Sequence, residues 1–200
     1  NSPYKSFSIT DFWRRWHMTL SFWLRDYLYI SLGGNRNGVV RTYLNLFLTM
    51  LLGGLWHGAS WTYVLWGGFH GLLLVIEKYF KLDKKPSSLL LKMRVGITFF
   101  LVVLGWVFFR AENMQLMLIW LNKLFSFEGG FKIVHFTART RDRFAGAMLI
   151  GTFIIWFCNN TTELDQIFKP TLRKAILLAI LFFGSVLFLG NNSPFLYFQF

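Results

Sequence analysis

Two histidines in aromatic surroundings are the strongest candidates for chemistry in this sequence. They occur as Arg15-Trp16-His17 and Trp56-His57-Gly58, and their positions differ by forty residues. His57 lies in the stretch 42–76, which contains no Asp, Glu, Lys or Arg. An uncharged segment of that length is typical of a membrane protein, and ionisable groups at membrane depth are functional candidates.

A neutral imidazole buried in a low-dielectric site keeps a lone pair that can accept a proton, so His57 is a candidate general base. A histidine that donates a hydrogen bond to a backbone carbonyl where a helix breaks would fit the sequence equally well. His57 has no nearby cysteine or second histidine at the spacing of a metal site, so we expect no metal. The sequence also has no serine-nucleophile, phosphate-loop or zinc-protease motif.

His17 is predicted to lie on the polar stripe of an amphipathic helix together with several arginines. At 100° per residue, one face of residues 11–30 is broad and aromatic, and the opposite stripe contains Asp11, Arg14, His17, Ser21 and Arg25. His17 either orients His57 or an acyl carbonyl, or it is a solvated interfacial residue. Arg14, Arg15 and Arg25 are candidates for contact with phosphates, which belong to an acyl donor or to lipid headgroups.

Glycines near His57 predict close helix packing. Gly54 and Gly58 flank His57, and His70 lies beside Gly67 and Gly71, a spacing that lets helices approach closely. We expect His70 to make an interhelical hydrogen bond near the site.

The composition favours an integral membrane protein. Hydrophobic residues make up 54% of the 200 residues and aromatic residues 20%, whereas charged residues make up only 15%. The formal charge of +12 comes from basic residues clustered between apolar runs, which fits membrane topology and anionic lipids better than nucleic acid. We therefore expect an all-α, polytopic transmembrane helical bundle and no nucleic-acid partner.

The expected elements follow from apolar runs and from the residues that break them. Residues 11–30 form an amphipathic, interfacial helix. Residues 43–76 form a short re-entrant-like pair, 43–57 and 61–76, with His57 on the turn; each helix would be about 23 Å long, less than the roughly 30 Å hydrocarbon core. Further spans are expected at 95–109, 144–158 and 175–189, another helix is conceivable near 114–125, and the aromatic tail 191–200 should dock against protein or the interface.

The distribution of basic residues supports the hairpin. If 42–76 turns back, residues 1–41, 77–94 and 159–174 share one side with 15 Lys and Arg, and 110–143 carries the other 6. This asymmetry favours the basic side as cytoplasmic. The sequence therefore predicts a multi-pass membrane protein whose C-terminal tail lies outside.

Long motifs in the first eighty residues resemble the membrane-bound O-acyltransferase family, in particular its bacterial alginate O-acetylation branch. These are the segments 11–27, 54–61 and 66–71, and the aromatic ending 194–200 adds to them. The chain resembles only the C-terminal half of such a protein, as part of a single domain. The resemblance implies that His57 is the catalytic histidine and that His17 is the second, less strictly required polar position.

The resemblance also implies an activity: acetyl transfer from a cytoplasmic donor, acetyl-CoA, toward an exported polysaccharide, with no tightly bound cofactor. It further implies that the protein lies in a bacterial inner membrane, in contact with membrane lipids. Its protein partners would be an extracytoplasmic acetyltransferase or other polysaccharide machinery. The ending resembles that of a small companion peptide in teichoic-acid alanylation, so Tyr197 is either an acyl relay or an aromatic anchor. The alternatives to catalysis are a non-catalytic glycan export channel and a scaffold for an extracellular transferase.

Overall fold

The computed structural model describes residues 1–126 and 138–188, and every element in these ranges is helical. The chain divides into two units, residues 1–158 and 159–200. The first contains a 3-10 turn η1 (Pro3–Lys5), the π-helical turn η2 (Leu24–Tyr29), and seven α-helices: α1 (Ile9–Arg15), α2 (Met18–Trp23), α3 (Gly38–Trp56), α4 (Trp61–Tyr79), α5 (Ser88–Arg110), α6 (Met114–Ser126) and α7 (Ala138–Phe157). The second contains α8 (Thr161–Ile167) and α9 (Leu172–Phe188).

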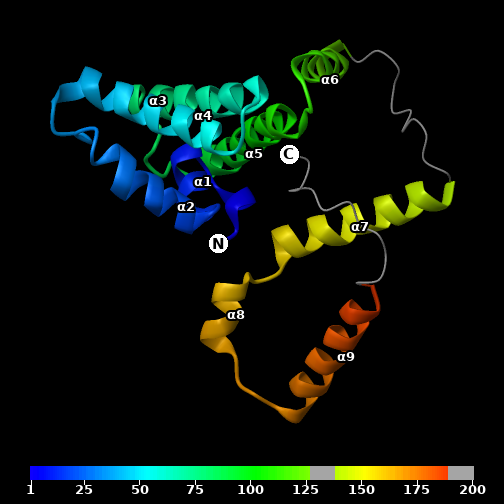
Figure 1. The fold of residues 1–200 in the computed structure, drawn as a ribbon. Helices are drawn as coiled ribbons and strands as arrows, with labels where there is room; N and C mark the ends of the chain where they lie inside the picture. The colour runs from blue at the N-terminus through cyan, green and yellow to red at the C-terminus, as the bar shows by residue number, and fades with distance from the viewer. Residues whose placement is uncertain (127–137, 189–200) are drawn as a thin grey trace. The chain divides into compact units, whose positions relative to one another are not determined.

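The centre of the first unit is the antiparallel pair α3 and α4, against which α1 and α5 pack (Figure 1). The buried apolar core lies where these four helices meet and comprises Ile9, Phe12, Trp13, Met50, Trp66, Leu74 and Val102. Many other large apolar side chains on the described helices are exposed, as on a surface that faces lipid. By length and composition, α3 and α5 are long and apolar enough to cross a membrane.

Glycines allow the backbones of α3 and α4 to touch. A methyl group at Gly54 would lie 2.3 Å from the carbonyl oxygen of Tyr63, and one at Gly67 would lie 2.4 Å from that of Met50. At Gly71 a methyl group would lie 3.0 Å from the carbonyl oxygen of Phe47. Because real side chains do not approach backbone atoms so closely, only glycine permits this hairpin.

The hairpin is longer than the sequence suggested. We expected short helices at 43–57 and 61–76, whereas α3 and α4 have 19 residues each, or about 28 Å. Glu77, which follows the expected end of the second helix, remains helical because its carboxylate accepts from backbone N–H groups of Ile9 and Thr10. Helix length alone therefore does not place His57 below a membrane surface.

The expected continuous helix at 11–30 is broken in the structure. α1 ends at Arg15, His17 adopts a left-handed backbone with φ of 40°, and α2 begins at Met18. A second irregularity follows at η2, where the helix widens to π-helical geometry. The residues of 11–30 are therefore mostly helical, as the periodicity indicated, but they form separate helices instead of one.

The other spans also begin earlier than expected. α5 starts at Ser88 rather than 95, α7 at Ala138 rather than 144, and α9 at Leu172 rather than 175. α6 occupies the region near 114–125 in which the sequence allowed a further helix. The tail 191–200 lies outside the described residues.

The close packing of α3 on α4 predicts opposite effects at two adjacent glycines. Gly67→Ala should lower the free energy of unfolding by about 1–3 kcal/mol, because its methyl group would strike the backbone of α3. Thermal unfolding of the purified protein in detergent measures the change.

Gly68→Ala is the matched control. A methyl group there meets only side-chain atoms at 3.7 Å or more, so stability should stay the same or rise slightly. Equal losses at Gly67 and Gly68 would contradict the backbone contact.

Candidate functional site

His57 terminates α3 and lies on the turn into α4. Its backbone N–H donates to the carbonyl of Gly54 at 3.0 Å, which closes the last turn of α3. Gly58 follows with φ of 147°, a conformation that glycine adopts easily, and Ser60 caps α4 with its side chain. The turn thus directs the imidazole back toward α4 and α5.

Aromatic rings enclose the His57 imidazole. The ring centroids of Trp56, Trp66 and Phe109 lie 5.1, 5.3 and 5.1 Å from it, all edge-to-face, and that of Tyr63 lies at 6.2 Å. The residue is 9% exposed. No hydrogen bond joins its ring nitrogens to a described residue, so the alternative of a histidine tied to a backbone carbonyl has no support here. The ring is shielded from water but keeps a free lone pair.

His17 is the second histidine at this site. It occupies the break between α1 and α2, its side chain is exposed, and it interacts electrostatically with His57. The structure therefore brings together two histidines from distant parts of the sequence. A non-glycine residue at positive φ stores backbone strain, and such strain clusters at functional sites.

The break that presents His17 is held from two directions. On one side Trp16 packs edge-to-face on Trp106 of α5, with centroids 5.1 Å apart. On the other, the carboxylate of Glu77 in α4 accepts from the backbone N–H groups of Ile9 and Thr10, the second at 2.9 Å. Glu77 thus satisfies N–H groups at the start of α1 and places a negative charge at the positive end of the helix.

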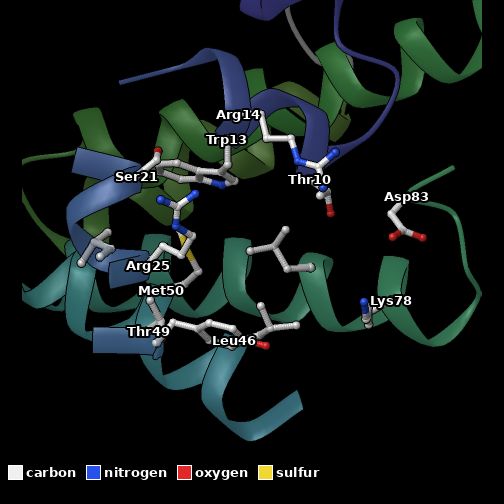
Figure 2. Close-up of a pocket in the computed structure, with 13 residues that line it drawn as sticks. Thr10, Trp13, Arg14, Ser21, Arg25, Leu46, Thr49, Met50, Lys78 and Asp83 are labelled. Carbon is white, nitrogen blue, oxygen red and sulfur yellow. The ribbon is translucent and has the colours of Figure 1, made fainter. Parts of the chain in front are cut away.

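The three arginines proposed for phosphate contact separate into two groups. Arg15 donates to Asp11 at 2.9 Å within α1. Arg14 and Arg25 line a pocket between α1, α2 and η2 on one side and α3 and α4 on the other (Figure 2). Arg25 also forms a two-point ion pair with Asp26, which holds the pKa of the Asp26 carboxyl below its usual value.

His70 lies in the core rather than beside His57. It is 2% exposed and contacts the rings of Phe12, Trp13, Trp66 and Phe69. The Nδ1 atom of His70 has no hydrogen-bond partner among the described residues. The hydrogen bond from His70 to another helix that we expected is therefore not found in this part of the chain. His70 and His57 both contact Trp66, so the core and the site share one indole.

Three enclosing residues were not identified from the sequence: Tyr63, Trp66 and Phe109. Tyr63 and Trp66 follow His57 by six and nine residues, a spacing that could have indicated one face of α4. Phe109 comes from α5, and only the tertiary structure reveals its role. Tyr197 lies outside the described residues. Among residues 1–126 and 138–188, no cluster of His, Cys, Asp and Glu could hold a metal ion.

Comparison with known proteins identifies the family. The sequence profile of the membrane-bound O-acyltransferase family matches residues 2–119, more than half of the chain. The chain belongs to the membrane-bound O-acyltransferase family. Both histidines, Glu77 and the enclosing rings lie within the matched region. Family membership and the two apolar helices together indicate a membrane location.

Individual relatives cover three named activities. The chain is 42% identical to a probable alginate O-acetylase of Pseudomonas putida, over 99% of this chain and 45% of that protein. It is 38% identical to a peptidoglycan O-acetyltransferase of Helicobacter pylori, over 100% of this chain and 42% of that protein. It is 33% identical to a teichoic acid D-alanyltransferase of Bacillus subtilis, over 56% and 32%. The chain thus spans less than half the length of these relatives.

The Glu77 contact predicts that α1 depends on a residue of α4. Glu77→Ala should lower stability by about 1–3 kcal/mol, because two N–H groups at the start of α1 lose their partner. It should also expose the 1–17 segment to proteolysis before the rest of the chain unfolds. Limited proteolysis followed by mass spectrometry measures this order.

Glu112→Ala removes an exposed carboxylate elsewhere and should leave both the stability and the cleavage order unchanged. Uniform loss of protection along the chain in Glu77→Ala would show that Glu77 does not act through α1.

Proposed function

We propose that this protein is a membrane O-acyltransferase that moves an acetyl group from a cytoplasmic donor, acetyl-CoA, toward an exported polysaccharide, with His57 as the general base. The observation that carries the proposal is the enclosed imidazole of His57, whose ring nitrogens form no hydrogen bond with the described residues. The fold and family membership fit this chemistry, and the surrounding rings supply the low dielectric that it needs.

The proposed reaction needs one proton acceptor and one group that orients the substrate. His57 takes the proton of the acceptor hydroxyl as the oxygen attacks the acetyl carbonyl carbon. The carbon–sulfur bond of the thioester then breaks, and the imidazolium returns the proton to the departing thiolate. His17, at the exposed end of the site, orients the acyl carbonyl or polarises it.

The aromatic enclosure serves the same chemistry by limiting water. Water that reached the acyl group would compete with the acceptor and hydrolyse the donor. The rings of Trp66 and Phe109 contact the imidazole edge-to-face and leave it 9% exposed, so they limit the contact of His57 with water. The rings also hold the imidazole by packing rather than by hydrogen bonds, which leaves both nitrogens available.

The acceptor class follows from the relatives by analogy. Two relatives are named for O-acetylation of alginate and of peptidoglycan, and a third for D-alanylation of teichoic acid. All three names describe acyl transfer to a polymer. We place the protein in a bacterial inner membrane as a multi-pass protein, as part of a single acyltransferase domain, working with extracytoplasmic transferase or polysaccharide partners.

His57→Ala should reduce acetyl transfer by at least about 10²-fold, because the proton acceptor is lost. Expression and membrane insertion should be retained, whereas thermal stability should fall by about 1–3 kcal/mol because loss of the enclosed ring leaves a cavity beside Trp66 and Phe109. Transfer from radiolabelled acetyl-CoA by the purified protein measures the chemistry directly.

His135→Ala, which removes a histidine that the sequence places in a basic loop, is the control and should transfer at the wild-type rate. In cells, polymer acetyl content is measured separately from polymer amount. Normal acetyl content in His57→Ala would overturn the assignment, and a loss of polymer itself would favour an export channel.

Tyr197 tests the acyl relay. If its hydroxyl accepts the acetyl group on the outer side before the polysaccharide does, Tyr197→Phe should abolish polymer acetylation while the protein still binds acetyl-CoA. Mass spectrometry of the C-terminal peptide should find an acetyl group on Tyr197 in the wild type. Full polymer acetylation in Tyr197→Phe would contradict the relay and favour the alternative that Tyr197 is an aromatic anchor.

A further inference from the structure

A pocket of about 280 Å³ lies apart from the two histidines. Its walls come from α1, α2 and η2 on one side and from α3, α4 and the loop after α4 on the other (Figure 2). Neither His57 nor His17 lines it. Its volume is close to the lower end for ligand pockets, so it suits a small group or one part of a larger molecule.

The charged residues of the pocket favour an anion. Arg14 and Lys78 come from different walls, are exposed, and form no ion pair with a described residue. Asp83 also lines the pocket, and Arg25 is already paired with Asp26. The charges without an ion pair are therefore Arg14 and Lys78 against Asp83, a net charge of +1. An anion bound between Arg14 of α1 and Lys78 of α4 would neutralise this net charge.

The rest of the lining favours an amphiphile over a free ion. Trp13, Leu24, Met50 and Leu74 are all buried apolar residues that line the pocket. An inorganic phosphate would leave this apolar surface uncovered, whereas glycerol carbons and the first methylenes of an acyl chain would cover it. The hydroxyl groups of Ser21 and Thr49 already donate to backbone carbonyls of Trp16 and Asn45, so Arg14 and Lys78 are the donors left for an anion.

The geometry points to a binding site for an anionic membrane phospholipid, with its phosphate between Arg14 and Lys78 and its glycerol and first methylenes over Met50 and Leu74. The acyl donor also carries phosphates, but the absence of both histidines from the lining separates this pocket from the place of acyl transfer. A bound lipid would join α1 to α4 beside the Glu77 contact. Because it binds the folded state, it should also raise thermal stability.

The test uses the purified protein in detergent micelles, titrated with phosphatidylglycerol or with zwitterionic phosphatidylcholine and observed by native mass spectrometry. One phosphatidylglycerol should be retained at least about tenfold more strongly than phosphatidylcholine. Arg14→Gln combined with Lys78→Gln should abolish this preference. Arg36→Gln combined with Arg41→Gln removes the same charge from exposed sites outside the pocket and should preserve it.

Leu46→Trp fills the apolar side of the pocket without changing charge and should also weaken phosphatidylglycerol retention at least about tenfold. Thermal unfolding without added lipid verifies that each variant is folded. Equal retention of the two lipids, unchanged retention in the Arg14 and Lys78 double variant, or equal loss in the control would overturn the proposal.

Competition distinguishes the phosphate sources. Inorganic phosphate and desulfo-CoA, each added in excess, should leave phosphatidylglycerol bound. Displacement by either would overturn the lipid assignment and make the pocket a free-phosphate site or a donor site. Since retention is measured without turnover, failure here leaves the acyltransferase proposal intact, and failure of acetyl transfer leaves this one intact.

Discussion

Direct contact between the backbones of α3 and α4 is the constraint on which the rest of the first unit depends. Gly54 and Gly67 bring carbonyl groups to distances that no side chain could occupy. With the helices this close, the turn at His57 is short, and the imidazole meets residues of α4 rather than open space. Wider separation would carry His57 away from Trp66 and remove the surface on which α1 and α5 pack.

The second element of the site is assembled on this hairpin by contacts distant in sequence. Glu77, near the end of α4, holds the start of α1, and Trp106 of α5 holds the end of α1 through Trp16. Between these anchors α1 has a fixed position, and the chain must leave it through the strained backbone of His17. The placement of His17 thus follows from packing between helices that are distant in sequence.

The sequence predicted the helical class and the hairpin because both depend on local patterns. An uncharged stretch of 35 residues with glycines at its middle indicates a turn between apolar helices. The break at His17 could not be predicted, since periodicity over 11–30 says nothing of a carboxylate at Glu77. The end of the second helix was predicted too early for a related reason: Glu77 is charged, but backbone N–H groups of α1 satisfy its carboxylate. Phe109 was missed because α5 meets the turn only in three dimensions.

A structure of the protein with a non-reactive acetyl-CoA analogue, in which the thioester is replaced by a ketone, tests the role of His57 most directly. If His57 is the base, the carbonyl carbon of the analogue should lie beside the ring, with space for one hydroxyl oxygen roughly 3 Å from a ring nitrogen and in line for attack. His17 should lie on the carbonyl side. An acetyl group bound elsewhere, with the rings of Trp66 and Phe109 still closed over His57, would contradict the proposed mechanism.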